Sequence, residues 1–387
     1  MKLSNRIVTV SPSLTLQITA KAKELKAQGR DVISFGAGEP DFDTPSHIKE
    51  KAIEAINNGF TKYTPASGMP SLKKVIVEKF SRDNALNFQE NQIIISCGAK
   101  HSLFNIFQVL LNEGDEVIIP APYWLSYPEM VKLAGGVPVF IETTQPNNFK
   151  IDAVALQKAL TKKTRVLILN SPSNPTGAVY TKAELQAIAD CAVKHSLYVV
   201  SDEIYEKLLY DGLKHVSIAS LGEKIKDYTI TVNGVSKSFA MTGWRIGYIA
   251  APAEIAKAIG TLQSHSTSNP TSFAQVGALE ALHAGEAACK KMVTVFSKRR
   301  DLIIKELSAI EEIIPFKPSG AFYAFCDISR TGLTAMDFAT RILDEANVAV
   351  IPGEPFGSPH HIRLSFAISD EAICKGVKRI GEWVHTL

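Results

Sequence analysis

Seven short runs of β-branched and aliphatic residues alternate with longer segments of helical periodicity in the middle of this chain. The runs lie at 93–95, 117–119, 137–141, 165–169, 197–200, 228–232 and 246–250. Between two of them, the segment 182–195 repeats apolar residues at the spacing of one helix face. Strands that alternate with helices predict an α/β fold with a mostly parallel seven-stranded sheet, covered by helices on both faces.

The chain has 387 residues, which is long for a single domain. After about residue 290 a long helical pattern is followed by strand-like runs at 320–325, 348–351 and 361–365. We therefore expect a large domain over residues 46–289. Residues 1–45 and 290–387 are expected to form a smaller α+β domain.

Composition excludes several classes of protein. Basic and acidic residues number 42 and 39, and no basic block is present, so no nucleic-acid partner is expected. No run of about 18 apolar residues predicts a membrane span, and residues 1–6 lack the apolar stretch of a signal peptide. The five cysteines are scattered and form no C-x-x-C pair. This favours free thiols in the cytoplasm and no metal site.

Residues that could carry chemistry follow the strand-like runs, where ligands of parallel sheets bind. Lys237 follows the run 228–232, with Ser236 beside it and Arg245 eight residues later. A lysine amine condenses with aldehydes, and hydroxyls and arginine bind phosphate. The pattern favours pyridoxal phosphate (PLP) as cofactor. The alternative is an ordinary exposed lysine in a loop.

Three further residues could contact such a cofactor. Asp202, after the run 197–200, could pair with a protonated pyridine nitrogen, or could only cap a surface helix. Tyr205 could donate to the phenolic oxygen of the cofactor. Asn174, in the Pro- and Gly-rich segment 170–177, could hydrogen-bond the same oxygen, although such a segment also simply builds a rigid turn.

Other candidates carry weaker signals. Gly98, Ala99 and Lys100 open a helical pattern, so their backbone N–H groups could bind a phosphate, although many helices begin this way. Trp124 could stack on a flat ring or belong to the core. Arg363 could bind a substrate carboxylate through two hydrogen bonds or lie on the surface.

Taken together, these motifs resemble the class I aminotransferases, which are PLP enzymes of fold type I. The motifs that carry the likeness are 34–42, 62–65, 170–177, 201–205 and 237–247, in the order and spacing of the family. The bacterial aspartate aminotransferase subgroup is the most similar, and the likeness covers nearly the whole chain. Many relatives carry a hydroxyl residue at the position of Gly234 and Ser-Gly-Thr at 98–100. These departures leave some phosphate contacts to the backbone.

The resemblance implies an enzyme that transfers the amino group of aspartate to 2-oxoglutarate by a ping-pong mechanism with PLP. Lys237 would attach the cofactor and act as base, Asp202 would hold the pyridine nitrogen, and Tyr205 and Asn174 would contact the phenolic oxygen. The other implied cofactor contacts are Gly98, Ala99, Lys100, Trp124, Ser236, Arg245 and, from a partner subunit, Tyr63. The implied substrate contacts are Gly38, Lys100, Trp124, Asn174, Arg363 and Thr15.

Because Tyr63 would reach across to a partner, the resemblance implies a homodimer with shared active sites. Lys100 would touch either the cofactor phosphate or the second carboxylate of a dicarboxylic substrate. Prephenate or aromatic amino acids are alternative substrates, since prephenate-active relatives carry a threonine that Thr15 could match. A PLP-dependent β-lyase and a non-catalytic PLP-binding regulator are alternatives of other classes, although no spare segment exists for the regulator's usual DNA-binding domain.

Overall fold

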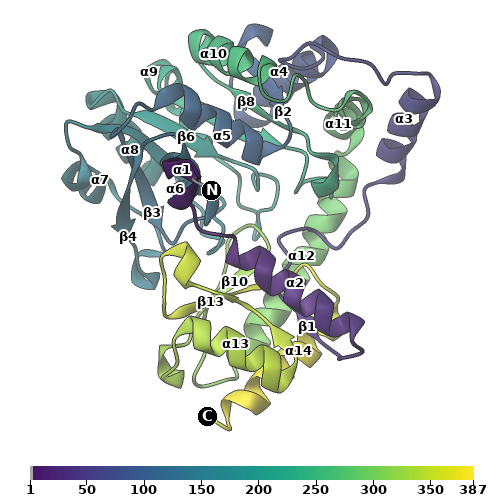
Figure 1. Ribbon diagram of the computed structural model, residues 1–387, viewed down its shortest axis with the longest axis vertical. Helices are drawn as coiled ribbons and strands as arrows, with labels where there is room; N and C mark the ends of the chain where they lie inside the picture. The colour runs from purple at the N-terminus through teal and green to yellow at the C-terminus, as the bar shows by residue number, and fades with distance from the viewer. Residues whose placement is uncertain (1–2) are drawn as a thin grey trace.

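The computed structural model describes residues 3–387, and its largest element is a seven-stranded sheet (Figure 1). The strands are β2 (Ile93–Ser96), β3 (Glu116–Ala121), β4 (Val137–Glu142), β5 (Thr164–Asn170), β6 (Tyr198–Asp202), β7 (Thr229–Gly234) and β8 (Gly247–Ala250). Their order is β2-β8-β7-β6-β5-β3-β4, and only β8 runs antiparallel to its neighbours. All seven predicted strands and the predicted fold class are confirmed.

Helices cover both faces of this sheet because its strands are apolar on both sides. Ile94 packs with one layer of helices, whereas Ile93 and Ile95 pack with the opposite layer. The first layer holds α5 (Ala99–Leu110), α6 (Ser126–Leu133) and α10 (Ala253–Ser264). The second holds α3 (Ser46–Asn57), α4 (Pro70–Asn84), α7 (Ala153–Ala159), α8 (Lys182–Lys194), α9 (Glu223–Asp227) and α11 (Ser272–Ala284).

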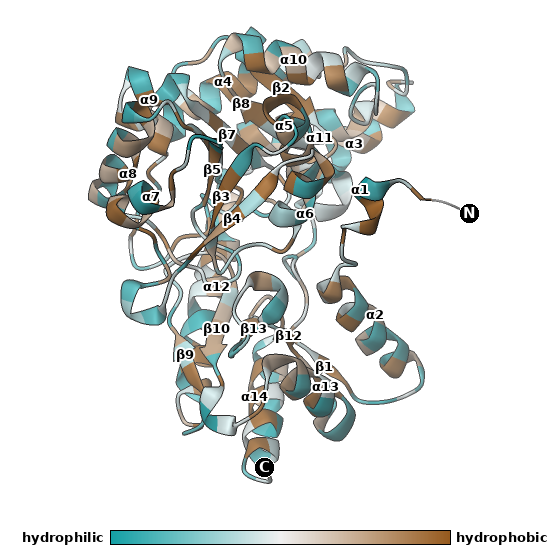
Figure 2. Cartoon of the chain, turned by 60° about the vertical axis from the view of Figure 1, so that its left-hand side comes forward, coloured by the Kyte–Doolittle hydropathy of each residue, from teal (hydrophilic) through white to brown (hydrophobic). Residues whose placement is uncertain are grey.

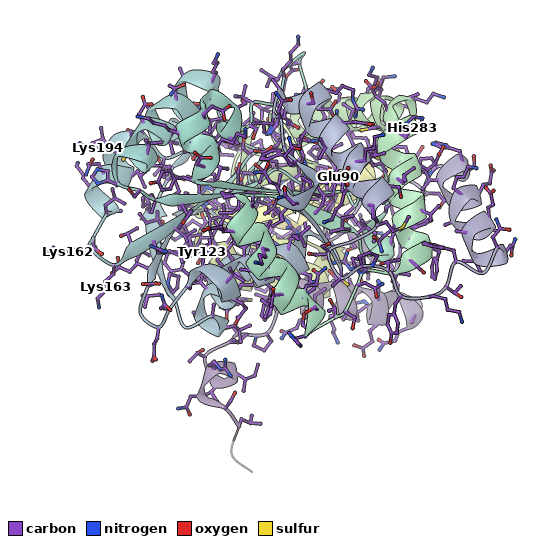
Figure 3. The ribbon with its side chains drawn as sticks, turned by 90° about the horizontal axis from the view of Figure 1, so that it is seen from above. Glu90, Tyr123, Lys162, Lys163, Lys194 and His283 are labelled. Carbon is purple, nitrogen blue, oxygen red and sulfur yellow. The ribbon has the colours of Figure 1, made fainter. Side chains whose placement is uncertain are left out.

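Hydropathy follows the same layering. The strands at the centre of the sheet are mostly brown in Figure 2, whereas the covering helices alternate between teal and brown residues. Seen from above in Figure 3, the polar residues Lys162, Lys194 and His283 lie toward the outer rim. Burial of the alternating aliphatic faces against helices therefore stabilises the sheet.

The lower part of the molecule contains two smaller sheets (Figure 1). Four antiparallel strands pair in the order β12-β13-β10-β9, and β1 pairs in parallel with β11. These strands are β1 (Ile33–Ser34), β9 (Ile314–Phe316), β10 (Tyr323–Asp327), β11 (Val348–Ala349), β12 (Ile351–Pro352) and β13 (His361–Ser365). The helices that accompany them are α2 (Leu14–Ala27), α12 (Glu286–Leu307), α13 (Ala335–Ala346) and α14 (Asp370–Val384).

The boundary between the two parts is crossed by continuous structure. Helix α12 runs through residues 289 and 290 without a break, and the short helix α1 (Asn5–Val8) lies near α6. Next to α1, the backbone N–H of Ser11 donates to Glu129 of α6 at 3.0 Å. The division at residues 45/46 and 289/290 therefore stays a proposal. Within residues 3–387, no helix is both long and apolar enough to cross a membrane.

The sheet topology brings several loops to one edge. Strands β5, β6 and β7 are parallel neighbours, so the loops that follow them emerge side by side. Because β8 is antiparallel to β7, the segment that precedes β8 also lies at this edge. The loops that carry Asn174, Lys237 and Arg245 are thereby gathered beside Asp202, the last residue of β6.

Candidate active site

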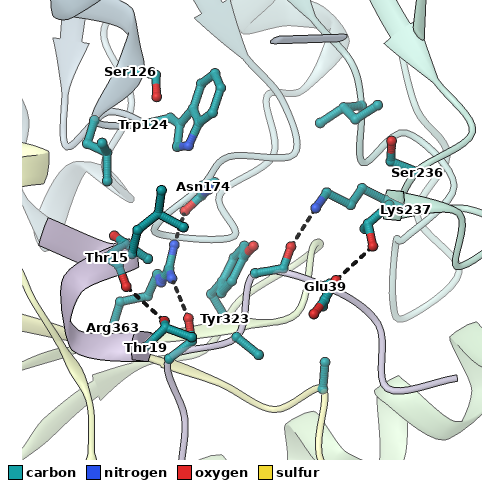
Figure 4. A pocket seen from close by; sticks show the side chains of 18 of the residues that line it. Thr15, Thr19, Glu39, Trp124, Ser126, Asn174, Ser236, Lys237, Tyr323 and Arg363 are labelled. Carbon is teal, nitrogen blue, oxygen red and sulfur yellow. Dashed lines mark hydrogen bonds between the residues drawn. The ribbon is translucent and has the colours of Figure 1, made fainter. Parts of the chain in front are cut away.

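A cavity of about 780 Å³ opens between this edge of the large sheet and the smaller sheets (Figure 4). Among the predicted residues, those that line it are Thr15, Gly38, Ala99, Lys100, Trp124, Asn174, Asp202, Tyr205, Ser236, Lys237, Arg245 and Arg363. Gly98 lies beside it, where an added Cβ would collide with the guanidinium of Arg245. Tyr63 is 90 % exposed and does not line the cavity of its own chain.

Lys237 lies just beyond β7 with its amine in the cavity. Nζ donates to the carbonyl of Gly38 and lies 5.8 Å from the ring centroid of Tyr205. Burial lowers the pKa of Lys237 to about 8, although the carboxylate of Glu39 opposes this shift. About a tenth of this amine is therefore neutral at pH 7, far more than for an ordinary lysine, which suits a nucleophile or a base.

Asp202 supplies a buried carboxylate at the end of β6. Its Oδ2 accepts a 2.6 Å hydrogen bond from the phenol of Tyr127, and its Oδ1 accepts one from the backbone of Ile204 at 3.2 Å. Burial raises the pKa of Asp202 to about 6, and the bond from Tyr127 limits that rise. The site therefore presents an anion near neutral pH.

Arg363 projects from β13 and is 2 % exposed. It donates to Oδ1 of Asn174 at 2.9 Å and to the carbonyl of Gly36 at 3.3 Å, and its guanidinium lies 4.4 Å from the ring centroid of Tyr323. Its buried Nε has no hydrogen-bond partner. An unpaired buried donor is costly, so a ligand that accepts from this guanidinium would be stabilised.

Groups suited to a phosphate surround the start of α5. Gly98 is the N-cap with φ of 95°, and the first N–H groups of a helix have no partner within it. The guanidinium of Arg245 donates to the carbonyls of Thr242 at 2.8 Å and Cys97 at 3.4 Å. These bonds hold the cation beside the helix, and the hydroxyl of Ser236 lines the same cavity.

The aromatic and phenolic groups complete the cavity wall. Nζ of Lys100 lies 4.9 Å from the ring centroid of Trp124, and burial, with a smaller effect of Arg245, lowers the pKa of Lys100. The hydroxyls of Tyr205 and Tyr323 lie 2.9 Å apart. Together with the amine, the buried carboxylate and the phosphate donors, this residue set fits PLP.

The sequence did not single out three groups of this site. Tyr127 holds Asp202, Tyr323 contacts both Tyr205 and Arg363, and the carbonyl of Gly36 holds Arg363. Tyr323 lies in a run that was predicted as a strand, but nothing in that run shows which side chain faces the cavity. Tyr127 follows Trp124 closely, yet its partner is 75 residues further along the chain.

In the described part of the chain, one group of side chains has the composition of a metal site: Glu203, Glu206 and His215. Lys79 forms a buried ion pair with Glu206, and Nε2 of His215 lies 2.9 Å from Glu203. Both carboxylates therefore have protein partners already. The absence of a metal stays a prediction.

The comparisons with known proteins agree with this geometry. Residues 30–380 match the family described as aminotransferase class I and II. An aspartate aminotransferase of Bacillus sp. (strain YM-2) is 55 % identical, with 99 % of each chain covered. An aspartate/prephenate aminotransferase of Nitrosomonas europaea is 46 % identical, with 98 % of this chain and 99 % of the relative covered.

A solved structure described as aspartate aminotransferase from Thermus thermophilus with maleate is also similar. Its TM-score is 0.95 at 45 % identity, and the match covers 99 % of each chain. A family match over most of the chain, with relatives of this identity, settles the family. The chain belongs to the class I and II aminotransferases.

Proposed function

We propose that this protein is an aspartate aminotransferase that uses PLP and transfers the amino group of aspartate to 2-oxoglutarate in a ping-pong reaction. The observation that carries the proposal is the cavity in which the amine of Lys237, the carboxylate of Asp202 and the guanidinium of Arg363 are held together. The names of similar proteins support the choice of aspartate.

When bound, PLP would supply an electron-withdrawing ring that stabilises negative charge at Cα of an amino acid. Asp202 would pair with the ring nitrogen, and its burial would keep that pair out of water. Tyr205 and Asn174 would donate to the phenolic oxygen, and Trp124 would pack on the ring. Arg245, with the first turn of α5 and the hydroxyl of Ser236, would bind the phosphate.

Lys237 would remove the proton from Cα of the bound amino acid and deliver it to the cofactor, because its return to Cα would only regenerate the amino acid. Its lowered pKa makes the neutral amine available for the first step without extreme pH. Arg363 and the backbone of Gly38 would bind the α-carboxylate, which orients the Cα–H bond toward Nζ. Lys100 would bind the second carboxylate, so that cations at two ends of the cavity select a dicarboxylic substrate.

The test is a half-reaction. The holoenzyme is mixed with single amino acids, and its visible absorbance is followed by stopped flow. Aspartate should convert the enzyme at least ~100-fold faster than phenylalanine or alanine at equal concentration, and oxaloacetate should be the product. A faster reaction with phenylalanine, or release of pyruvate and ammonia, would contradict the assignment. Lys237→Ala should abolish conversion in the absence of an added amine.

Prephenate is the second candidate substrate. Thr15 lines the cavity, and its buried Oγ1 has no hydrogen-bond partner. One similar protein is named as an aspartate/prephenate enzyme. If Thr15 binds this substrate, Thr15→Val should lower kcat/KM for prephenate about tenfold, which corresponds to the loss of one hydrogen bond. The value of kcat/KM for aspartate should stay unchanged. Equal losses for both substrates would contradict the role.

We further propose a cytoplasmic homodimer in which Tyr63 of each chain contacts the phosphate bound by its partner. Tyr63 is exposed in the single chain, and Ile53, Ile56 and Phe60 nearby in the sequence are also exposed apolar residues. Burial of these side chains against a second copy would stabilise a dimer. All five cysteines are free, which suits a reducing compartment.

A further inference from the structure

The segment 36–41 touches both cations on which substrate binding would depend. The carbonyl of Gly38 accepts from Nζ of Lys237, and the carbonyl of Gly36 accepts from Arg363 at 3.3 Å. The segment lies between β1 and α3 and contains no helix or strand. No continuous ladder of backbone hydrogen bonds fixes it, so its position depends on contacts made by its side chains and neighbours.

Arg299, on α12, holds the far end of this segment. Its Nη1 donates to both oxygens of Asp41 at 2.8 and 2.9 Å, and its Nε donates to Asp370 in the first turn of α14 at 3.1 Å. The guanidinium also lies 5.6 Å from the ring centroid of Phe42. A planar guanidinium held by two carboxylates has a defined orientation, so the segment is tied to α12 and α14 together.

The next residue of the same helix makes a similar structure away from the cavity. Arg300 is buried and donates to Asp211 at 2.7 and 2.9 Å and to Asp301 at 2.8 Å. Asp41 lines the cavity, whereas Asp211 and Asp301 are not among the described residues that line it. The two arginines therefore resemble each other in burial and pairing but differ in what they hold.

We propose that Arg299 is a positioning residue for the substrate site. Through Asp41 it fixes the segment 36–41, so that the carbonyls of Gly36 and Gly38 keep Arg363 and Lys237 in place. The proposal rests on the proposed function, because it takes Arg363 as the group that binds the α-carboxylate. It assigns no contact between Arg299 and the substrate.

Loss of the guanidinium loosens the end of the segment at Asp41 without removing any group that touches the substrate, while the 2.7 Å hydrogen bond from the Thr242 hydroxyl to Glu39 remains. In Arg299→Gln the carbonyl of Gly36 no longer holds Arg363 in one orientation, and the α-carboxylate is bound less tightly. We expect KM for aspartate to rise on the order of tenfold or more, because small misplacements of binding groups have large effects. The carbonyl of Gly38 also shifts relative to Lys237, but Lys237 and Asp202 themselves stay fixed at the ends of β7 and β6, so kcat should fall by less than about threefold and by less than KM rises.

The experiment compares holoenzyme variants in KM, kcat and affinity for maleate, an unreactive dicarboxylate, measured by calorimetry. Arg299→Gln and Asp41→Asn should each raise KM and weaken maleate binding. The double variant should be no worse than Arg299→Gln alone, because both changes remove the same interaction. An unchanged KM and maleate affinity in Arg299→Gln, or fully additive effects in the double variant, would overturn the proposal.

Two variants separate positioning from simple destabilisation. Arg300→Gln should lower stability in urea but leave KM and maleate affinity within about twofold of wild type. The reason is that Arg300 holds Asp211 and Asp301, which do not line the cavity, and separate sites act independently. An equal rise in KM in Arg300→Gln would show a general effect and overturn the proposal. Arg299→Lys should recover only part of the loss, because one ammonium cannot replace the two separate nitrogens, Nη1 and Nε, that donate to Asp41 and Asp370. Failure of wild type to react with aspartate would instead contradict the proposed function.

Discussion

The phenol of Tyr127 donates a 2.6 Å hydrogen bond to Oδ2 of Asp202, and both side chains are buried. The donor comes from α6 and the acceptor from the end of β6. This bond favours the ionised carboxylate, whereas burial opposes ionisation and raises the pKa of Asp202 to about 6. The protonation state of Asp202 therefore depends on a residue outside the proposed cofactor contacts.

The first prediction concerns this bond. Tyr127→Phe removes a donor to a carboxylate, so the pKa of Asp202 should rise further. A hydrogen bond to a charged group contributes about 1.5–3 kcal/mol, so the acidic limb of kcat/KM should move up by about one to two pH units. The pH profile of kcat/KM measures it. Tyr180→Phe, at another buried tyrosine, is the control and should leave the limb in place.

The second prediction concerns Arg363. Arg363→Lys keeps the charge but cannot hold Asn174, Gly36 and a carboxylate at once. Loss of a two-point contact of about 2–3 kcal/mol should raise KM for aspartate and for 2-oxoglutarate roughly 30- to 150-fold. Steady-state kinetics measure the change. The exposed Arg341, changed to lysine, should behave as wild type, and a normal KM in Arg363→Lys would exclude the assigned role.

The third prediction concerns the stability of the cofactor-free protein. The pKa of Lys237 falls to about 8 in the folded protein, whereas an unfolded lysine titrates near 10.4. The unfolded chain binds more protons between these values, so wild-type stability should rise with pH across this window. Below about pH 8, Lys237→Met should be more stable than wild type by about 1–2 kcal/mol. This is less than the pKa shift alone would give, because Nζ faces the cavity and solvent there screens its charge.

Urea unfolding of the cofactor-free proteins at pH 7 and pH 10 measures this difference. The advantage of Lys237→Met should shrink at the higher pH, because wild type then loses the cost of a buried cation. Lys257→Met removes an exposed lysine from α10 and should show no such pH dependence. An equal stability of Lys237→Met and wild type at pH 7 would contradict the burial argument.

The fourth prediction concerns the buried pair of Lys79 and Glu206. Asn84 joins the pair, since it accepts from Lys79 at 2.8 Å and donates to Glu206 at 3.0 Å. Lys79→Met leaves a buried carboxylate unpaired and should lower the free energy of unfolding by about 3–5 kcal/mol. The double variant Lys79→Met/Glu206→Leu should recover much of this loss. Denaturant midpoints measure both, and a further loss in the double variant would refute the explanation.

The fifth prediction tests whether active sites are shared. Tyr63→Ala and Lys237→Ala are prepared separately and then allowed to exchange subunits. A hybrid dimer would contain one site with Lys237 from one chain and Tyr63 from the other, so activity should exceed the sum of the two parents. If Tyr63 acted within its own chain, mixing would restore nothing. Sedimentation at the assay concentration measures the dimer fraction.

The sequence was sufficient to predict the large sheet because most of its strands are short apolar runs that are buried on both faces, although the edge strand β4 is partly exposed. The run at 197–200, for example, predicts a strand that the structure places at Tyr198–Asp202. Its last residue, Asp202, pairs with Val232 of β7. The position of Lys237 and Asp202 at the same edge follows from the parallel order of these strands. The candidate cofactor residues could therefore be found from local patterns.

The supporting contacts could not be found in this way. Tyr127 and Asp202 are 75 residues apart, and Arg299 and Asp41 are 258 residues apart. Their pairing depends on how α6 packs on the sheet and how the segment 36–41 lies against α12, which no local pattern specifies. The same holds for Tyr323, whose side-chain direction in β10 is set by its pairing with β13.

Asn174, Asp202 and Lys237 lie at or just beyond the carboxyl ends of three adjacent strands, and neighbouring strands lie about 4.8 Å apart. The relative placement of these groups is consequently inherited from the backbone of the sheet, and a shift of one residue in any strand would displace its group by about 3.3 Å. Thr15, Gly38 and Arg363 instead come from separate elements outside that sheet. During evolution, relatives of this protein can accordingly acquire new substrates through these outer elements while the type of reaction is retained.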